Sequence, residues 1–245
     1  MTEESVETLY LIGKLDLVVG VSAYVKRPTH AREIETISAF THANIKKIKA
    51  LKPDLILGFS DIQQDIAKTL IGEGLNVFIS NQRSLDEILN YIVLLSSMVG
   101  EANKGIALRE AFLIKIEKTK KQNLDKKPKV YFEEWNDPLI SAIKWVSELI
   151  TICGGEDIFS TISNGVKAKD RFITEQDIID KNPDIILGCW CGKKVDIDSI
   201  KNRKDFHKIN AVKNNRVFEL EPEIYLQPGP ALFVDGLDQL SKLLN

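Results

Sequence analysis

Two segments of the chain, one in each half, repeat the same short pattern. Residues 52–58 read KPDLILG, and residues 182–188 read NPDIILG. Each segment follows a helical pattern and ends at a glycine, and its apolar run is typical of a strand buried on both faces of a parallel sheet. The repeat predicts one equivalent strand in each half, with Phe59-Ser60 and Cys189-Trp190 at equivalent places beyond the two strand ends.

Other apolar runs alternate with helical patterns on both sides of this repeat. The predicted strands include residues 17–21, 77–79, 130–132 and 216–220, and the predicted helices include residues 143–150 and 232–244. Alternation of this kind is characteristic of parallel sheets covered by helices. The sequence therefore predicts an α/β fold with two lobes, each built on a parallel sheet.

A long helical stripe separates the two halves. It starts at Ser84, a suitable N-cap with Glu87 three residues on, and meets no proline before Pro128. We interpret residues 84–127 as a single long helix joining an N-terminal lobe, residues 1–83, to a C-terminal lobe, residues 128–245. Gly100 and Gly105 are the positions at which this helix could divide. This organisation predicts a ligand cleft between the lobes.

Aromatic, amide and charged residues follow the apolar runs in both halves. In open α/β sheets, ligands bind beyond the carboxyl ends of the strands, and planar faces with a few polar groups suit a small-molecule site. Trp145 lies within a helical stripe and is assigned to the core. The predicted ligand-binding residues are Tyr24, Phe40, Phe59, Ser60, Gln82, Arg83, Glu134, Trp135, Trp190, Lys193, Lys194, Tyr225 and Gln227.

The sequence carries no recognisable catalytic or metal-binding motif. None of His30, His42 and His207 stands in a nucleophile context, and no glycine-rich phosphate loop is present. Cys189 and Cys191 lack the second cysteine pair that a structural zinc site needs. We therefore expect a binding protein rather than an enzyme, with no intrinsic cofactor and no metal site.

Charge and hydropathy restrict the partners. A net charge of −2 does not favour nucleic-acid binding, and no apolar run is long enough to cross a bilayer. The acidic N-terminus lacks the features of a signal peptide. The chain as given is therefore expected to be cytoplasmic, or periplasmic or cell-surface if an N-terminal segment has been removed. We expect a monomer.

The sequence resembles the class III solute-binding proteins of ABC importers for cobalamin and ferric siderophores. The resemblance covers nearly the whole chain and is most similar to the cobalamin-binding branch. It is most specific at residues 19–22 (VGVS), 51–56 (LKPDLI), 154–159 (GGEDIF) and 182–186 (NPDII). It implies two α/β lobes joined by a long helix, a ligand held between them, and a permease partner.

The chain departs from this family pattern in two places. The family has a strand before the segment that resembles residues 2–12, and Met1 stands where that strand would end. Without this strand, residues 17–21 are expected to pair with a neighbouring strand on fewer sides. The family also docks on its permease through one exposed glutamate on each lobe. The corresponding positions fall near residues 63–65 and His207, and neither place holds a glutamate.

Three functions follow as hypotheses. The first is binding of a corrinoid such as cobalamin, which the aromatic set and its amide and hydroxyl neighbours favour. The second is binding of a ferric siderophore or haem, whose negative charge Arg27, Arg83, Arg171, Lys193 and Lys194 could neutralise. The third is an enzyme or ligand-handling protein on the same fold, with Glu134 and Lys193 or Lys194 as its polar centre.

Overall fold

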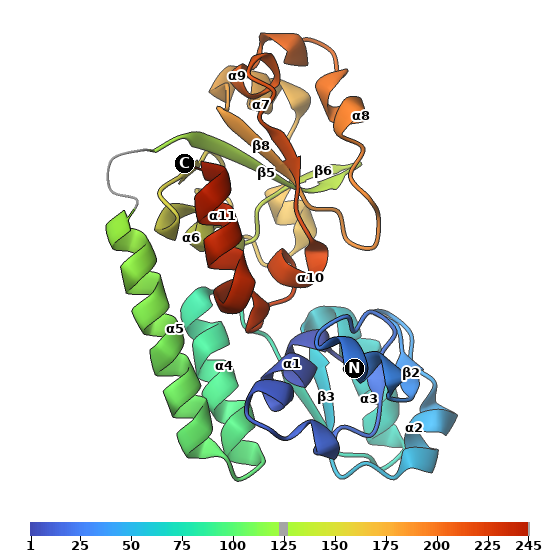
Figure 1. Cartoon of the computed structure of the whole chain (residues 1–245). Coiled ribbons are helices and arrows are strands. Elements are labelled where there is room, and N and C mark those ends of the chain that lie inside the picture. The colour runs from blue at the N-terminus through green and yellow to red at the C-terminus, as the bar shows by residue number, and fades with distance from the viewer. Residues whose placement is uncertain (123–126, 245) are drawn as a thin grey trace. The chain divides into compact units, whose positions relative to one another are not determined.

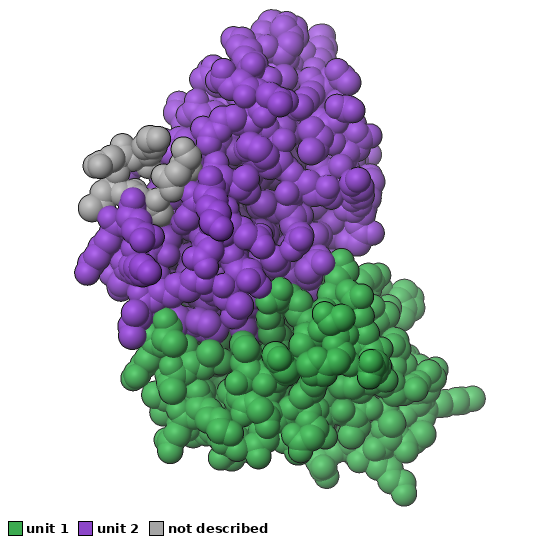
Figure 2. Space-filling view, in the orientation of Figure 1, with its two compact units in different colours: residues 1–82, 86–111 green, residues 83–85, 112–245 purple. Residues whose placement is uncertain are grey.

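The computed structural model describes residues 1–122 and 127–244. They fall into two compact units (Figure 2). Unit 1 comprises Met1–Gln82 and Asp86–Ala111, and unit 2 comprises Arg83–Leu85 and the chain from Phe112 onward. Each unit contains parallel strands and helices, which confirms the α/β class and the two-lobed plan.

Unit 1 is built from two pairs of parallel strands with helices between them (Figure 1). Strand β1 pairs with β2, and β3 pairs with β4. The elements are α1 (Glu3–Leu11), η1 (Leu15–Leu17), β1 (Val21–Ser22), η2 (Thr29–Glu33), β2 (Thr36–Ser38), α2 (Ile45–Leu51), β3 (Ile56–Phe59), η3 (Asp61–Gln63), α3 (Gln64–Gly72), β4 (Val77–Ser80), α4 (Leu85–Met98) and the first part of α5 (Ala102–Gln122).

Unit 2 is built on a five-stranded sheet. Its path runs β6-β5-β8-β9, with β7 also paired to β5, and all of these pairings except β5–β6 are parallel. The elements are β5 (Lys129–Asn136), β6 (Leu139–Ser141), α6 (Lys144–Ile152), β7 (Glu156–Asp157), η4 (Ala168–Arg171), α7 (Glu175–Lys181), β8 (Ile185–Gly188), α8 (Ile197–Lys201), η5 (Phe206–Lys208), α9 (Asn210–Lys213), β9 (Val217–Glu219), α10 (Pro222–Tyr225), η6 (Leu232–Gly236) and α11 (Leu237–Leu244).

The two copies of the sequence repeat adopt the same local structure. Helix α2 ends at Lys52 with φ 48°, and helix α7 ends at Asn182 with φ 46°. A left-handed residue at this point ends a helix and turns the chain away from it. A proline and an aspartate follow, and then β3 in unit 1 and β8 in unit 2. Both predicted strands are therefore confirmed, and each follows the same helix end and the same proline and aspartate.

The interpretation of residues 84–127 as one continuous helix is wrong. The described part of this segment holds two helices, α4 and α5, and the chain turns between them at Gly100, where φ is 77°. Gly105 does not break a helix. A Cβ atom there would lie 2.5 Å from Cβ of Ser96, so glycine allows α5 to approach α4 closely. Residues 123–126 of the predicted connector lie outside the described residues.

The predicted strand at residues 17–21 is much shorter in the structure. Residues Leu15–Leu17 form a 3₁₀ turn, and the strand is limited to Val21–Ser22. The side chains of Leu17 and Val19 are 51% and 46% exposed, so this apolar run is not a buried strand. The run is apolar enough for a strand, but β2 offers it only two paired positions.

We predict that this segment exchanges its amide hydrogens faster than β3. Strand β3 pairs with β4 at four consecutive positions, from Ile56 to Phe59, whereas β1 pairs with β2 at two. Local opening is easiest where few hydrogen bonds and few apolar contacts must break. Hydrogen–deuterium exchange with peptides covering residues 17–21 and 55–59 measures the difference. Equal and strong protection of both peptides would contradict the prediction.

Candidate functional site

The carboxyl ends of three parallel strands meet along one edge of the unit 2 sheet. Strand β8 lies between β5 and β9, and backbone bonds continue past its end: Cys189 N donates to Glu133 O at 2.9 Å, and Leu220 N donates to Gly188 O at 2.8 Å. We call the last residues of β5, 134–136, and the residues that follow the end of β8, 190–194, the unit 2 rim. This is the edge at which the sequence predicts a ligand.

A buried carboxylate lies directly beneath the unit 2 rim. The side chain of Glu133 is fully buried and accepts hydrogen bonds from Tyr131 Oη at 3.0 Å and from Trp190 Nε1 at 3.1 Å. Both terminal nitrogens of Arg203 donate to the same carboxylate, with Nη2 2.9 Å from Oε1. Burial and the neighbouring Glu133 raise the pKa of Tyr131 well above its ordinary value. The phenol therefore stays protonated and remains a donor.

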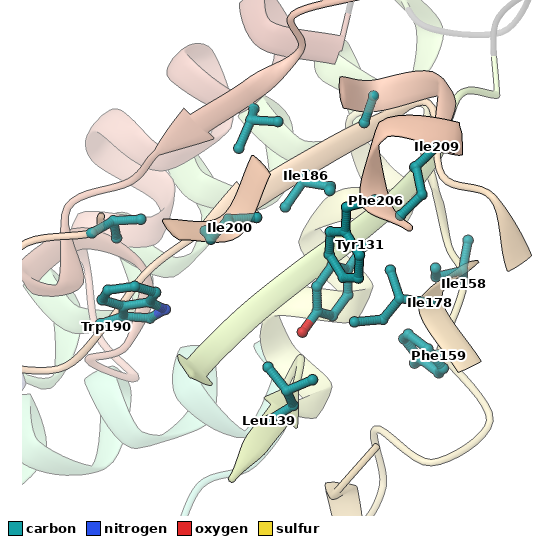
Figure 3. Packing of buried hydrophobic residues seen from close by; sticks show 13 residues of the cluster. Tyr131, Leu139, Ile158, Phe159, Ile178, Ile186, Trp190, Ile200, Phe206 and Ile209 are labelled. Carbon is teal, nitrogen blue, oxygen red and sulfur yellow. The ribbon is translucent and has the colours of Figure 1, made fainter. Parts of the chain in front are cut away.

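The predicted placement of Trp190 on the ligand-facing side is wrong. Trp190 has no exposed surface and belongs to the hydrophobic core of unit 2, where it appears with Tyr131 and Phe206 (Figure 3). The physical reason is its hydrogen bond to Glu133, which gives the indole N–H a buried partner. In the repeat, Trp190 is equivalent to Ser60 rather than to Phe59, and Ser60 is buried as well.

Tyr225 is also buried rather than exposed at a strand end. Its hydroxyl donates to Gly236 O at 3.1 Å, and its carbonyl accepts from Trp145 Nε1 at 2.9 Å. Burial raises the pKa of Tyr225. Trp145 is buried, as predicted for a core residue. These contacts make Tyr225 a part of the packing between helices α6, α10 and η6.

Trp135, Asn136 and Lys193 form the polar and aromatic part of the unit 2 rim. Trp135 is half-buried and donates from Nε1 to Asp137 O at 2.9 Å. The ammonium of Lys193 lies 5.7 Å from the ring centre of Trp135, 4.8 Å from that of Trp190 and 3.4 Å from Asn136 Oδ1. Lys194 beside it is exposed.

Glu134 is held by a buried arginine. Arg171, 2% exposed, donates to both carboxylate oxygens of Glu134, with Nη2 2.9 Å from Oε1, and also to Ser141 O. The carboxylate is therefore paired with Arg171, and not with Lys193 or Lys194 as the predicted polar centre of an enzyme requires. Because the charge of Arg171 is compensated by Glu134, it is not available to neutralise an anionic chelate.

At the carboxyl ends of the unit 1 strands, the buried polar groups are hydroxyls and not charged side chains. Ser22, Ser38, Ser60 and Ser80 stand at or just beyond the carboxyl ends of β1, β2, β3 and β4, and all four are buried. Ser60 N donates to Ser80 O at 2.7 Å, and Ser80 Oγ donates to Gly58 O at 3.3 Å. Only Ser60 is among the predicted site residues, although a serine after each apolar run is visible in the sequence.

Gln63 joins the loops at this edge. Its Oε1 accepts from Phe59 N at 3.0 Å, and its Nε2 donates to Phe40 O and Met1 O, each at 3.2 Å. A Cβ atom on Gly58 would lie 2.7 Å from Gln63 Oε1, so glycine is required for this approach. Gln63 is 1% exposed and cannot be a permease-docking residue, whereas Gln64, Asp65 and His207 are exposed.

Tyr24 and Phe40 are the exposed aromatic residues of this edge, which we call the unit 1 rim together with Phe59 and Ser60. Their exposed fractions are 45% and 37%, in the loops that follow β1 and β2. Phe59 is half-buried at the end of β3. The structure therefore brings these predicted residues to one edge of unit 1.

Comparison with known proteins identifies the family of this chain. The periplasmic binding protein family matches residues 1–224. The chain belongs to this family. It is 26% identical over 249 residues to an uncharacterised ABC transporter substrate-binding lipoprotein of Bacillus subtilis, covering 96% of this chain and 76% of the relative. It is 26% identical over 250 residues to the vitamin B12-binding protein of Vibrio cholerae, covering 100% of this chain and 87% of that protein.

The similarity extends to the fold. A crystal structure of the periplasmic vitamin B12 binding protein of Vibrio cholerae matches with a TM-score of 0.78 at 25% identity, covering 100% of this chain and 94% of the other. The resemblance drawn from the sequence is thereby confirmed. Within residues 1–122 and 127–244, no helix combines the length and apolarity needed to span a bilayer.

The remaining predicted residues are placed as follows. Gln82 is buried at the end of unit 1, and Arg83 is half-buried and belongs to unit 2, not to the N-terminal lobe. Gln227 is half-buried in the loop after α10. Among residues 1–122 and 127–244, no three of the His, Cys, Asp and Glu side chains gather as ligands for a metal ion.

We predict that Cys191 is the thiol that reacts in the native protein. Cys191 is exposed on the unit 2 rim, whereas Cys153 and Cys189 are buried. Burial raises the pKa of Cys153 to about 11 and that of Cys189 well above its usual range, which removes the reactive thiolate. Iodoacetamide at pH 8 followed by peptide mass spectrometry should find one modified cysteine before unfolding and three after it. Rapid native labelling of Cys189 would contradict this arrangement.

We also predict that the Glu133–Arg203 pair stabilises unit 2. Removing one partner of a buried ion pair leaves the other charge uncompensated, which costs about 3–5 kcal/mol. Arg203→Met should therefore lower the free energy of unfolding in urea by an amount of that order. Lys204→Met, one residue along the chain and exposed, is the matched control. Equal stability of the two variants would mean that the pair contributes nothing.

Proposed function

We propose that this chain is the substrate-binding component of an ABC importer and that its ligand is a corrinoid such as cobalamin. The observation that carries the proposal is the match along the whole chain to a vitamin B12-binding protein, 26% identical over 250 residues. The aromatic side chains of both rims support it, because planar faces with polar neighbours suit a large, flat ligand. The protein would bind, and release its ligand to a permease, without catalysing a reaction.

The structure favours a bound molecule whose metal ion is already chelated. Among the described residues, no three His, Cys, Asp or Glu side chains gather as ligands for a bare metal ion. A corrinoid, a haem or a ferric siderophore carries its metal already chelated. Such a ligand needs only aromatic surface, hydrogen bonds and compensating charge from the protein. We propose a periplasmic or cell-surface location for this function.

A ferric siderophore or haem is the second candidate. Lys193 and Lys194 at the unit 2 rim favour it, because both are exposed cations at a predicted ligand edge. Arg171 no longer contributes to this argument, since it is paired with Glu134. That a single ligand contacts the rims of both units stays a prediction, which variants in each rim can test separately.

Native mass spectrometry of the purified protein separates these candidates. The protein is mixed in turn with cyanocobalamin, hemin and a ferric siderophore at equal concentration. We expect one corrinoid bound per chain, retained at micromolar concentration. Retention of hemin or the siderophore alone would select the second candidate. Failure to retain any of the three, or turnover of a ligand, would overturn the proposal.

We predict that one aromatic residue in each rim contributes to binding. Tyr24→Ala and Trp135→Ala should each weaken binding of cyanocobalamin about tenfold, from lost apolar contact and aromatic stacking. Tyr10→Ala is the matched control for Tyr24, because Tyr10 is 44% exposed in the same unit and lies on α1. Titration of intrinsic fluorescence gives the affinities. Unchanged affinity for both rim variants would place the ligand elsewhere.

A further inference from the structure

Lys193 is exposed, yet the unit 2 rim holds its ammonium in a defined place. The nitrogen lies over the ring of Trp190 at 4.8 Å and over the ring of Trp135 at 5.7 Å. Cations within about 6 Å of an indole centre are attracted by the negative face of the ring. Asn136 Oδ1 adds a third contact at 3.4 Å. Two indoles and an amide thus restrict a side chain that is ordinarily among the most mobile.

The groups that hold Lys193 are themselves fixed. Trp190 is fully buried, and its indole nitrogen is bound to Glu133, which is in turn bound by Arg203. Trp135 is anchored through Nε1 to Asp137 O at 2.9 Å. A lysine on such a support loses little side-chain entropy on binding a ligand, because most of that freedom is already restricted.

The ammonium of Lys193 carries a positive charge on the exposed unit 2 rim. Among the residues that the structure describes, no carboxylate forms an ion pair with its ammonium. The acidic side chains of the neighbouring strands β5 and β9 accept hydrogen bonds from other groups. Glu133 is bound by Arg203, Glu134 is bound by Arg171, and Glu219 accepts from Val195 N at 2.9 Å. A positioned cation with no anion is the arrangement expected where a ligand supplies the anion.

We infer that Lys193 binds an anionic oxygen of the ligand, so that this protein prefers metal chelates that carry a free carboxylate. Trp190 is a positioning residue, which acts on the ligand through Lys193. The inference rests on the proposed function, because it assigns a ligand group to the same rim. It narrows the ligand class within both candidates, since corrinoids and haems each exist in forms that differ only in one or two carboxylates.

Paired ligands test this directly. One pair is cyanocobalamin and its monocarboxylic acids, in which one side-chain amide is hydrolysed; the other is hemin and its dimethyl ester, compared in the same detergent. The wild-type protein should bind the acid of whichever pair it accepts about tenfold more tightly than the neutral form. Lys193→Met keeps the stem that covers the indoles but removes the charge, and should abolish the preference. Lys194→Met, the adjacent exposed lysine, should keep it.

The positioning role of Trp190 has its own readout. Trp190→Phe keeps an aromatic ring under the ammonium but removes the donor to Glu133. It should reduce the acid-over-neutral preference, whereas a purely structural change would weaken both ligands equally. Raising the ionic strength should weaken binding of the acid in the wild type and leave Lys193→Met unaffected.

The outcomes separate the two proposals. A wild type with no preference, or a Lys193→Met variant that retains it, overturns the assignment of Lys193 while leaving the proposed function in place. If Lys193→Met and Lys194→Met lose the preference equally, the assignment of Lys193 is also overturned. The preference would then come from the total positive charge of the rim. Binding of no member of either pair overturns the proposed corrinoid function itself, and haem binding with it.

Discussion

The buried carboxylate of Glu133 is the interaction on which the organisation of unit 2 depends. A charged group with no exposed surface must be compensated where it lies. Tyr131 and Trp190 each donate one hydrogen bond, and Arg203 donates two, so that strand β5, the end of β8 and the segment after α8 are tied to one point. The core packing of Trp190 and the position of the rim above it follow from this arrangement.

The two units have different polar groups at the carboxyl ends of their strands. Unit 2 uses ion pairs and indoles, which fix directions and leave a positive charge at the surface. Unit 1 uses buried serines and the side chain of Gln63, which satisfies three backbone groups from three separate segments. These hydroxyl and amide groups are buried and carry no net charge, and the exposed part of the unit 1 rim is the aromatic surface of Tyr24 and Phe40.

The sequence was most informative about the backbone and least about side-chain direction. The repeat predicts two equivalent strands correctly, because a proline-aspartate pair and an apolar run that ends at a glycine are local signals in the sequence. The repeat does not show on which side of the chain Trp190 lies, because a shift of one residue along an extended segment exchanges the two sides. Its equivalent in the repeat is Ser60, which is buried as well. The partners of Glu133 could not be read from the sequence, since Arg203 is distant along the chain. A charged residue directly after an apolar run, as in Tyr131–Glu133, was the available signal.

Helix α5 has a consequence for how such a chain can be divided. Its residues 102–111 belong to unit 1 and its residues from Phe112 to Gln122 belong to unit 2, without a linker at the boundary. A cut at this boundary gives each fragment a new helix end, at which up to four backbone groups have no partner within the helix. The two lobes are therefore not modules that can be exchanged between relatives at a flexible joint. A functional chimera has to inherit the α4–α5 hairpin whole, and recombination within the family is expected to respect it.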